Sequence, residues 1–108
     1  MPLKTGHLKK KKLLDIYPFY NVISSKSAKI GAVWQVDEGM IKCYSVPLYR
    51  GMYQEGVTYI HNPAIFTVLD TGEDGWYAIH VLGETRIDWI NVLKDKHMFE
   101  AVTLIKIA

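Results

Sequence analysis

The residues of this chain that can do covalent or metal chemistry are few and scattered. Its single cysteine, Cys43, lies in an alternating pattern of apolar and polar residues, and this favours a small core side chain over a nucleophile. The four histidines are dispersed, and none has metal-ligand spacing relative to Cys43. We therefore expect no metal site and no cofactor. The dispersed histidines are His7, His61, His80 and His97.

Acidic residues gather near two short turns that contain glycine: Asp70, Glu73, Asp74 and Glu84. Two carboxylates at such a place can act as general acid and general base. Acidic side chains at hairpin turns are, however, usually solvated turn formers. The sequence also has no glycine-rich strand-to-helix loop of the kind that holds phosphates. We therefore expect a protein without catalytic activity.

Aromatic residues make a better case for binding. If residues 76–81 form an alternating strand, Trp76 lies opposite the more apolar face, where a large amphipathic ring can serve as a binding platform. Tyr49, Tyr53 and Trp89 are the expected companions of Trp76 in an aromatic groove that holds an extended peptide. The alternative is that these rings only close the ends of a small β-structure. The more apolar face of the strand would carry Tyr77, Ile79 and Val81.

Positive charge is concentrated at the amino terminus. Residues 1–30 carry seven lysines and one acidic residue, whereas residues 31–108 carry six basic and ten acidic residues. A basic arm on a mildly acidic body suggests contact with nucleic acid, with a membrane surface, or with an acidic patch on another protein or a neighbouring copy. A solvated, solubilising tail is the alternative. The candidate anion-binding residues are Lys9, Lys10, Lys11 and Lys12.

The strands that must position these side chains are best marked in the second half of the chain. Residues 65–70 and 76–81 are rich in β-branched and aromatic side chains, and a polar turn with two glycines separates them. That pattern is a hairpin signal. A second short turn leads to a third run, residues 85–92. The sequence therefore predicts a three-stranded antiparallel meander.

Shorter strand signals flank the meander. We expect strands over residues 32–36, 40–46 and 57–60. Residues 101–107 are apolar on both faces, as in a strand that is buried on both sides or that completes the sheet of another subunit. Many short strands with frequent turn signals are typical of an all-β fold, a small barrel or a sandwich.

Three segments fit this pattern less regularly. Residues 13–22 allow an edge strand that runs to or beyond Pro18, because proline cannot donate to a central ladder. Residues 48–56 lack alternation and predict a long loop. Residues 91–96 suggest one helical turn, and the alternative is a helix over residues 88–99 with Asp88 as its cap.

Length and composition limit the class of protein. The chain has 108 residues, and we expect a flexible basic arm over residues 1–12 and a single domain over residues 13–108. No stretch approaches the roughly 18 apolar residues of a membrane span. We expect no secretory signal, because no long apolar run and no small-residue cleavage site follow the lysines. One cysteine excludes an internal disulfide and predicts a reducing compartment such as the cytoplasm. A virion component is the other location that we expect.

The middle of the chain, residues 43–94, resembles a Src-homology-3-type barrel of the bacterial kind. Residues 46–49, Val-Pro-Leu-Tyr, are similar to the family's Ala-Leu-Tyr opening. Residues 74–78, Asp-Gly-Trp-Tyr-Ala, match its Gly/Asp-Trp-Trp/Tyr signature, and residues 84–90 lie where the family has Gly-Tyr-Ile/Val-Pro. The resemblance implies a small barrel with an aromatic ligand groove. The chain adds the basic arm and a further strand at its carboxyl end.

These observations favour a non-catalytic protein-binding or assembly module over an enzyme. A compact barrel with reaching termini is the architecture of small structural subunits, such as the connector proteins of bacteriophage virions. We expect a protein partner or neighbouring subunits. One alternative is a regulatory or host-directed module that binds a peptide around Trp76. Another is a nucleic-acid-binding barrel whose lysine arm gives weak contact with a polyanion.

Overall fold

The computed structural model describes residues 16–24, 30–45 and 56–107. Several predictions fall on the remaining residues and therefore lie outside the described part of the chain. They concern the basic arm with Lys9, Lys10, Lys11 and Lys12, and the predicted groove residues Tyr49 and Tyr53.

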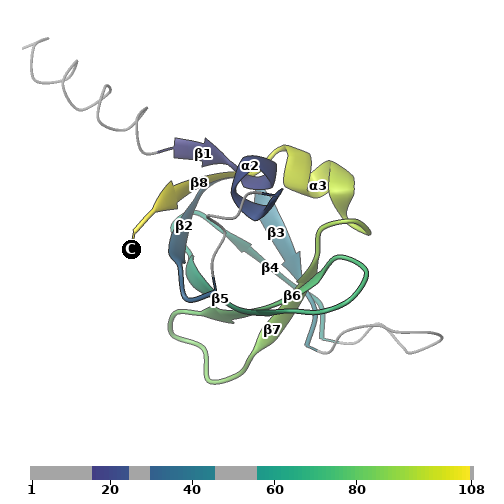
Figure 1. Ribbon diagram of the computed structural model, residues 1–108. Coiled ribbons are helices and arrows are strands. Elements are labelled where there is room, and N and C mark those ends of the chain that lie inside the picture. Colours follow the sequence, from purple (N-terminus) through teal and green to yellow (C-terminus); the bar gives the residue numbers. More distant parts are fainter. Residues whose placement is uncertain (1–15, 25–29, 46–55, 108) are drawn as a thin grey trace, which may run out of the picture.

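The described residues form an all-β structure with two short helices (Figure 1). The elements are β1 (Ile16–Pro18), α2 (Phe19–Ser24), β2 (Val33–Glu38), β3 (Met40–Cys43), β4 (Thr58–His61), β5 (Ile65–Thr71), β6 (Trp76–Val81), β7 (Asp88–Asn91), α3 (Lys96–Glu100) and β8 (Thr103–Lys106). Six strands form one antiparallel sheet in the order β1-β8-β2-β5-β6-β7, and β3 pairs with β4. The prediction of the all-β class is confirmed.

The predicted three-stranded meander is present as β5, β6 and β7. β5 pairs with β6 through registers such as Val68 with Ile79, and β6 pairs with β7 through Ala78 and Trp89. The turn between β5 and β6 needs residues with positive φ, and Gly75 adopts φ +85° there. Glycine takes this conformation without a steric penalty, so the turn signal in the sequence was a sound guide.

A long hairpin bends so that its two halves belong to different sheets. β2 runs into β3 through Gly39, and β4 runs into β5 through the turn at the cis Asn62–Pro63 bond. The first halves pair as β2 with β5, and the second halves pair as β3 with β4. A single bridge then joins the smaller sheet to β7, because the amides of Tyr44 and Trp89 each donate to the other's carbonyl, at 2.7 and 2.8 Å. In the described residues the strand ladders do not form one closed sheet.

The main core lies between the inner face of the large sheet, the smaller sheet and the two helices. Alternate residues of the central strands point inward, and they are Trp34, Val36, Phe66, Val68, Ile79 and Leu104. The helices lie beside each other at one end of the sheet (Figure 1). They close that end through Phe19 and Phe99, whose rings are 4.5 Å apart.

The two ends of the described chain meet in neighbouring strands. β1 is an edge strand, as expected, and it pairs with β8, which lies between β1 and β2. Two alternatives were open for residues 101–107, burial on both faces or completion of another subunit's sheet. β8 pairs on both edges within its own chain, and burial on both faces is wrong for the second face. Leu104 is fully buried, but Ile105 is partly exposed and Ile107 is 48% exposed. The reason is that only the inner face of this sheet meets the core.

The helical segments agree with the prediction only in part. After Pro18 the chain turns into α2 instead of continuing as a strand. The expected helical turn does form, because the amide of Asp95 donates to the carbonyl of Asn91 at 3.2 Å. The alternative helix over residues 88–99 does not form, because residues 88–91 are β7 and α3 covers only residues 96–100. The side-chain oxygen of Asn91 accepts the amides of Leu93 and Lys94, at 3.0 and 2.8 Å, and this local turn ends β7 before α3 begins. No helix within the described residues is long and apolar enough to cross a membrane.

The bend at Gly39 generates a stability prediction. Gly39 has φ +86°, and an added Cβ would lie 2.7 Å from the backbone oxygen of Ala101. Gly83 has φ +96° but no atom within 4 Å of that position. We expect Gly39→Ala to lower the free energy of unfolding by about 2–4 kcal/mol, through strain and steric overlap together. Gly83→Ala has the strain alone, and we expect a loss of about 1 kcal/mol.

Urea unfolding of both variants measures the difference. The interpretation of Gly39 as a close-packed hinge is contradicted if the two glycine variants lose equal stability.

Candidate functional site

Two of the predicted groove residues lie together on one face of the meander. Trp89 stands directly opposite Ala78 in the β6–β7 ladder, and Trp76 is two residues before Ala78 on the same face. Tyr44, at the end of β3, bridges to Trp89 and packs edge-on against Trp76, with ring centroids 5.4 Å apart. This aromatic cluster of Tyr44, Trp76 and Trp89 lies outside the main core.

The aromatic cluster does not present the open platform that we expected. Trp76 is 2% exposed and Tyr44 is fully buried, and only Trp89 remains partly exposed. The role of Trp76 in ligand binding stays a prediction, and the burial of its ring is in line with the alternative, in which the rings close the β-structure. The strand pattern correctly placed Trp76 on the face opposite the core. That face is nevertheless covered at Trp76, where the ring of Tyr44 packs against it.

Polar groups hold Tyr44 in place. Its hydroxyl donates to Oδ2 of Asp95 at 2.9 Å. The ammonium groups of Lys42 and Lys94 lie 5.3 and 5.0 Å from the centre of its ring, within the range of cation–π attraction. Burial raises the pKa of the Tyr44 hydroxyl, and the hydrogen bond to Asp95 raises it further. Tyr44 thus joins the end of β3 to the segment before α3.

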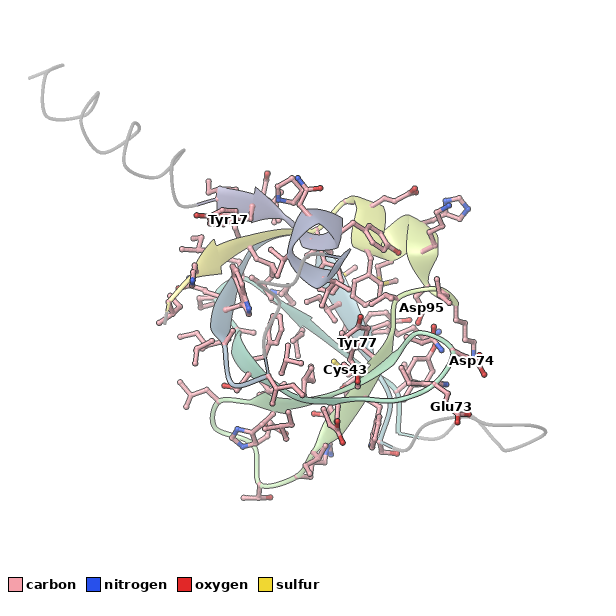
Figure 2. The ribbon with its side chains drawn as sticks, viewed as in Figure 1. Tyr17, Cys43, Glu73, Asp74, Tyr77 and Asp95 are labelled. Atoms are coloured by element: carbon pink, nitrogen blue, oxygen red, sulfur yellow. The ribbon has the colours of Figure 1, made fainter. Side chains whose placement is uncertain are left out.

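Cys43 occupies the interior between the sheets (Figure 2). Burial raises the pKa of its thiol to about 12, with a smaller contribution from Asp88 that Arg86 partly offsets. Asp88 is itself buried and accepts a hydrogen bond from Nε of Arg86 at 3.1 Å. The thiol is therefore protonated at neutral pH and has no nucleophilic character there. The interpretation of Cys43 as a core residue agrees with this burial.

The acidic residues near the turns are exposed. Figure 2 shows Glu73 and Asp74 at the periphery, on the turn between β5 and β6. Oδ1 of Asp70 accepts the amide of Thr71 at 2.8 Å, which is a local turn contact. Glu84 contributes its backbone to the next turn, where its carbonyl lies 2.8 Å from Nε2 of His80. Within the described residues, no group of three or more His, Cys, Asp or Glu is arranged to hold a metal ion.

The outer face of the large sheet is more accessible than the aromatic cluster. Registered pairs place Ile16, Ile105, Gln35 and Ile65 in one row across four strands, and Val33, Thr67 and His80 in the next row. Both helices pack on the opposite, inner side. Three flanking side chains are more exposed: Leu82 at 68%, Ile87 at 49% and Ile107 at 48%. We call these ten residues the outer face.

A groove of about 400 Å³ adjoins the outer face where β4 turns into β5. Eight residues line it: Tyr59, Ile60, His61, Asn62, Pro63, Ala64, Ile65 and Leu82. Its lining includes no aspartate, glutamate, lysine or arginine. Tyr59 is 48% exposed, and Ile65 and Leu82 are shared with the outer face. This β4 groove can take an apolar side chain, because ligand sites are concave and mostly apolar.

Neither the outer face nor the β4 groove was recognised from the sequence. Alternate residues of a strand point to opposite faces of the sheet, so the sequence of residues 65–70 places Ile65 and Thr67 on one face and Phe66 and Val68 on the other. Both sets contain apolar residues, so alternation alone did not show which face is exposed. Comparisons of the chain with protein-family models, with curated proteins and with solved structures found no match.

Because Trp76 is buried, we expect its substitution to affect the stability of the fold. We expect Trp76→Ala to lower the free energy of unfolding by about 3–5 kcal/mol, because it leaves a large cavity beside Tyr44. Trp76→Phe keeps a ring at this position and should lose much less. Thermal and urea unfolding of the two variants test this. Equal, near-zero losses for both would contradict the burial of Trp76.

The buried thiol generates a prediction about pH. In the native protein at pH 8 we expect Cys43 to react with a disulfide reagent at least 100-fold more slowly than in urea, because a rise of the pKa from 9.0 to about 12 removes most of the thiolate. The folded state holds this proton more tightly than the unfolded chain. Its contribution to stability is therefore complete below about pH 9 and is lost as the pH rises toward 12.

Urea midpoints between pH 8 and 11 provide the second measurement. Wild type should lose stability more steeply with rising pH than Cys43→Ala. Rapid labelling of the native thiol, or identical slopes for the two proteins, argues against the buried protonated state.

Proposed function

We propose that this chain is a non-catalytic protein-binding or assembly module. The observation that carries this proposal is the outer face: four of the seven side chains in its two adjoining rows are apolar, three exposed aliphatic side chains flank the rows, and both described helices pack on the other side. Large contiguous apolar surfaces on small proteins mark sites of interaction with other proteins, because leaving them in water is unfavourable. A protein partner or neighbouring subunits would cover this face.

The resemblance to a Src-homology-3-like barrel supports a modular role. Two of its motifs fall on β6 and on the segment around β7, which are neighbours in the sheet, and the third, residues 46–49, lies outside the described residues. Such barrels serve as compact scaffolds for contacts with other proteins. Together with the basic arm, this architecture suits a structural subunit of a large complex such as a virion. A chain of that kind is a cytoplasmic or virion component.

A second candidate function is peptide binding at the aromatic cluster. It is favoured by the convergence of Trp89 with Trp76 and by the two lysines that flank Tyr44. Trp89 is the only partly exposed ring of the three. A ligand at this place would therefore contact Trp89 first.

The experiment is affinity capture from the native source with the immobilised full-length chain, followed by mass spectrometry. The outer-face variant combines Ile87→Ser and Ile107→Ser. Leu93→Ser is the matched control, because Leu93 is 64% exposed and lies beside Gly75, away from the outer face. We expect the outer-face variant to recover at least tenfold less partner than wild type or the control.

The competing outcomes distinguish the candidates. Loss of partner with Trp89→Ala, but not with the outer-face variant, would favour the aromatic cluster. Retention of the same partner by all three variants would contradict both proposals. Circular dichroism and unfolding curves confirm that each variant is folded before it is compared.

A further inference from the structure

The main chain of β4 has one free edge. β4 pairs with β3 alone, and in the described residues the only other backbone contact given for it is the turn bond from the amide of Ala64 to the carbonyl of His61, at 2.8 Å. The rest of its other edge has no backbone partner among those residues. The strand consists of Thr58, Tyr59, Ile60 and His61, and it contains no aspartate, glutamate, lysine or arginine. An unpaired edge of this kind is a ready template for another strand.

The geometry shows why the edge is free. β5 pairs with β2 on one side and with β6 on the other. β4 is the continuation of β5 beyond the bend, and its partner β3 is the continuation of β2. Among the described residues, no strand fills the place beside β4 that β6 would take, because β6 stops at Val81 and the amide of Leu82 makes the last contact, 2.8 Å from the carbonyl of Ile65.

The β4 groove occupies that same place. Seven of its eight lining residues run from Tyr59 to Ile65, and Leu82 closes the far side. A strand laid along β4 would therefore gain main-chain hydrogen bonds from the edge and a pocket for alternate side chains from the groove. Four residues of added strand span about 14 Å.

The other exposed edges are less suitable. β1 has three residues and ends in Pro18, which has no amide hydrogen to donate. The outer edge of β7 already receives Tyr44 through the bridge to Trp89. Edge strands are commonly blocked by proline, by charge or by a covering segment. In the described part of the chain, β4 shows none of these protections.

Charge and area indicate the occupant. The groove has no carboxylate, ammonium or guanidinium group, so the side chains that enter it are uncharged and apolar. β4 and the lining of the groove together comprise nine residues, which is far fewer than the roughly 20–30 residues per side of a standard interface between globular proteins. The surface therefore fits a short extended segment rather than the body of a second copy.

We propose that β4 accepts an extended, uncharged segment of a partner protein as an added strand, with an apolar side chain in the β4 groove. This inference rests on the proposed function, and it names the mode by which a partner is held. The outer face continues into the groove through Ile65 and Leu82, so one partner can cover both.

The probe is a panel of acetylated, dye-labelled nonapeptides in which alternating valine or isoleucine and threonine are flanked by glycine and serine. Matched peptides carry N-methyl groups on alternate amides, which block strand pairing and leave the side chains unchanged. Binding to the full-length chain is measured by fluorescence anisotropy. Leu82→Asp is the groove variant and Leu93→Asp is its matched control, since the two leucines are 68% and 64% exposed.

We expect at least one peptide of the panel to bind and to lose at least tenfold in affinity upon N-methylation. Leu82→Asp should cause a similar loss, and Leu93→Asp should cause none. Hydrogen exchange of the bound protein should show new protection in residues 58–61. Proline substitution in β4 is avoided, because it can unfold the hairpin.

Three outcomes overturn the inference. They are failure of the whole panel to bind, binding that N-methylation leaves unchanged, and protection that appears at β1 or on the outer face instead of β4. Each of these leaves the proposed function standing if the captured partner still depends on Ile87 and Ile107. If the peptides bind at β4 but substitution of Ile87 and Ile107 does not reduce capture of the partner, the role of the outer face is rejected instead.

Discussion

The bend in the long hairpin is the constraint on which the rest of the described structure depends. Between β2 and β3 the chain passes so close to Ala101 that only a glycine fits at position 39. The opposite arm bends between β4 and β5, at Pro63. Because both arms bend together, one half of the hairpin enters the large sheet and the other half lies across the core. The main core is enclosed by this change of direction, and the helices close the remaining end through Phe19 and Phe99.

The same bend determines which surfaces are available for binding. It separates β4 from the end of β6, so the β4 groove opens beside an unpaired edge. It also brings Tyr44 to the edge of β7, where Tyr44 covers Trp76 and holds Asp95. One consequence is an accessible apolar groove, and the other is a buried aromatic cluster. The most conspicuous tryptophan in the sequence therefore stabilises the fold, and less conspicuous aliphatic residues line the accessible surfaces.

Polar residues in the interior serve the fold in the same way. Asn91 is buried, accepts two amides of the following turn and donates to the carbonyl of Asp74, so it joins β7 to the turn before β6. Asp88 is buried beside Arg86. Each of these groups has a specific partner, as buried polar groups must. These polar side chains thus stabilise the fold, and the proposals for the outer face and for β4 start from other residues.

The sequence by itself determined the local structure. Period-two alternation and paired glycines located β5, β6 and β7 and the turns between them, because these signals depend on residues close together in the chain. It also placed Cys43 correctly among core residues. The sequence did not show which segments of the chain pack on each face of the strands. The sequence left open whether Trp76 forms a binding platform or closes the β-structure, because its burial depends on contact with Tyr44. It predicted the turn after β7 but not α3 over residues 96–100, whose Phe99 packs on the distant Phe19. The free edge of β4 arises where β6 ends and β5 bends, and only the tertiary structure brings those two events to the same place.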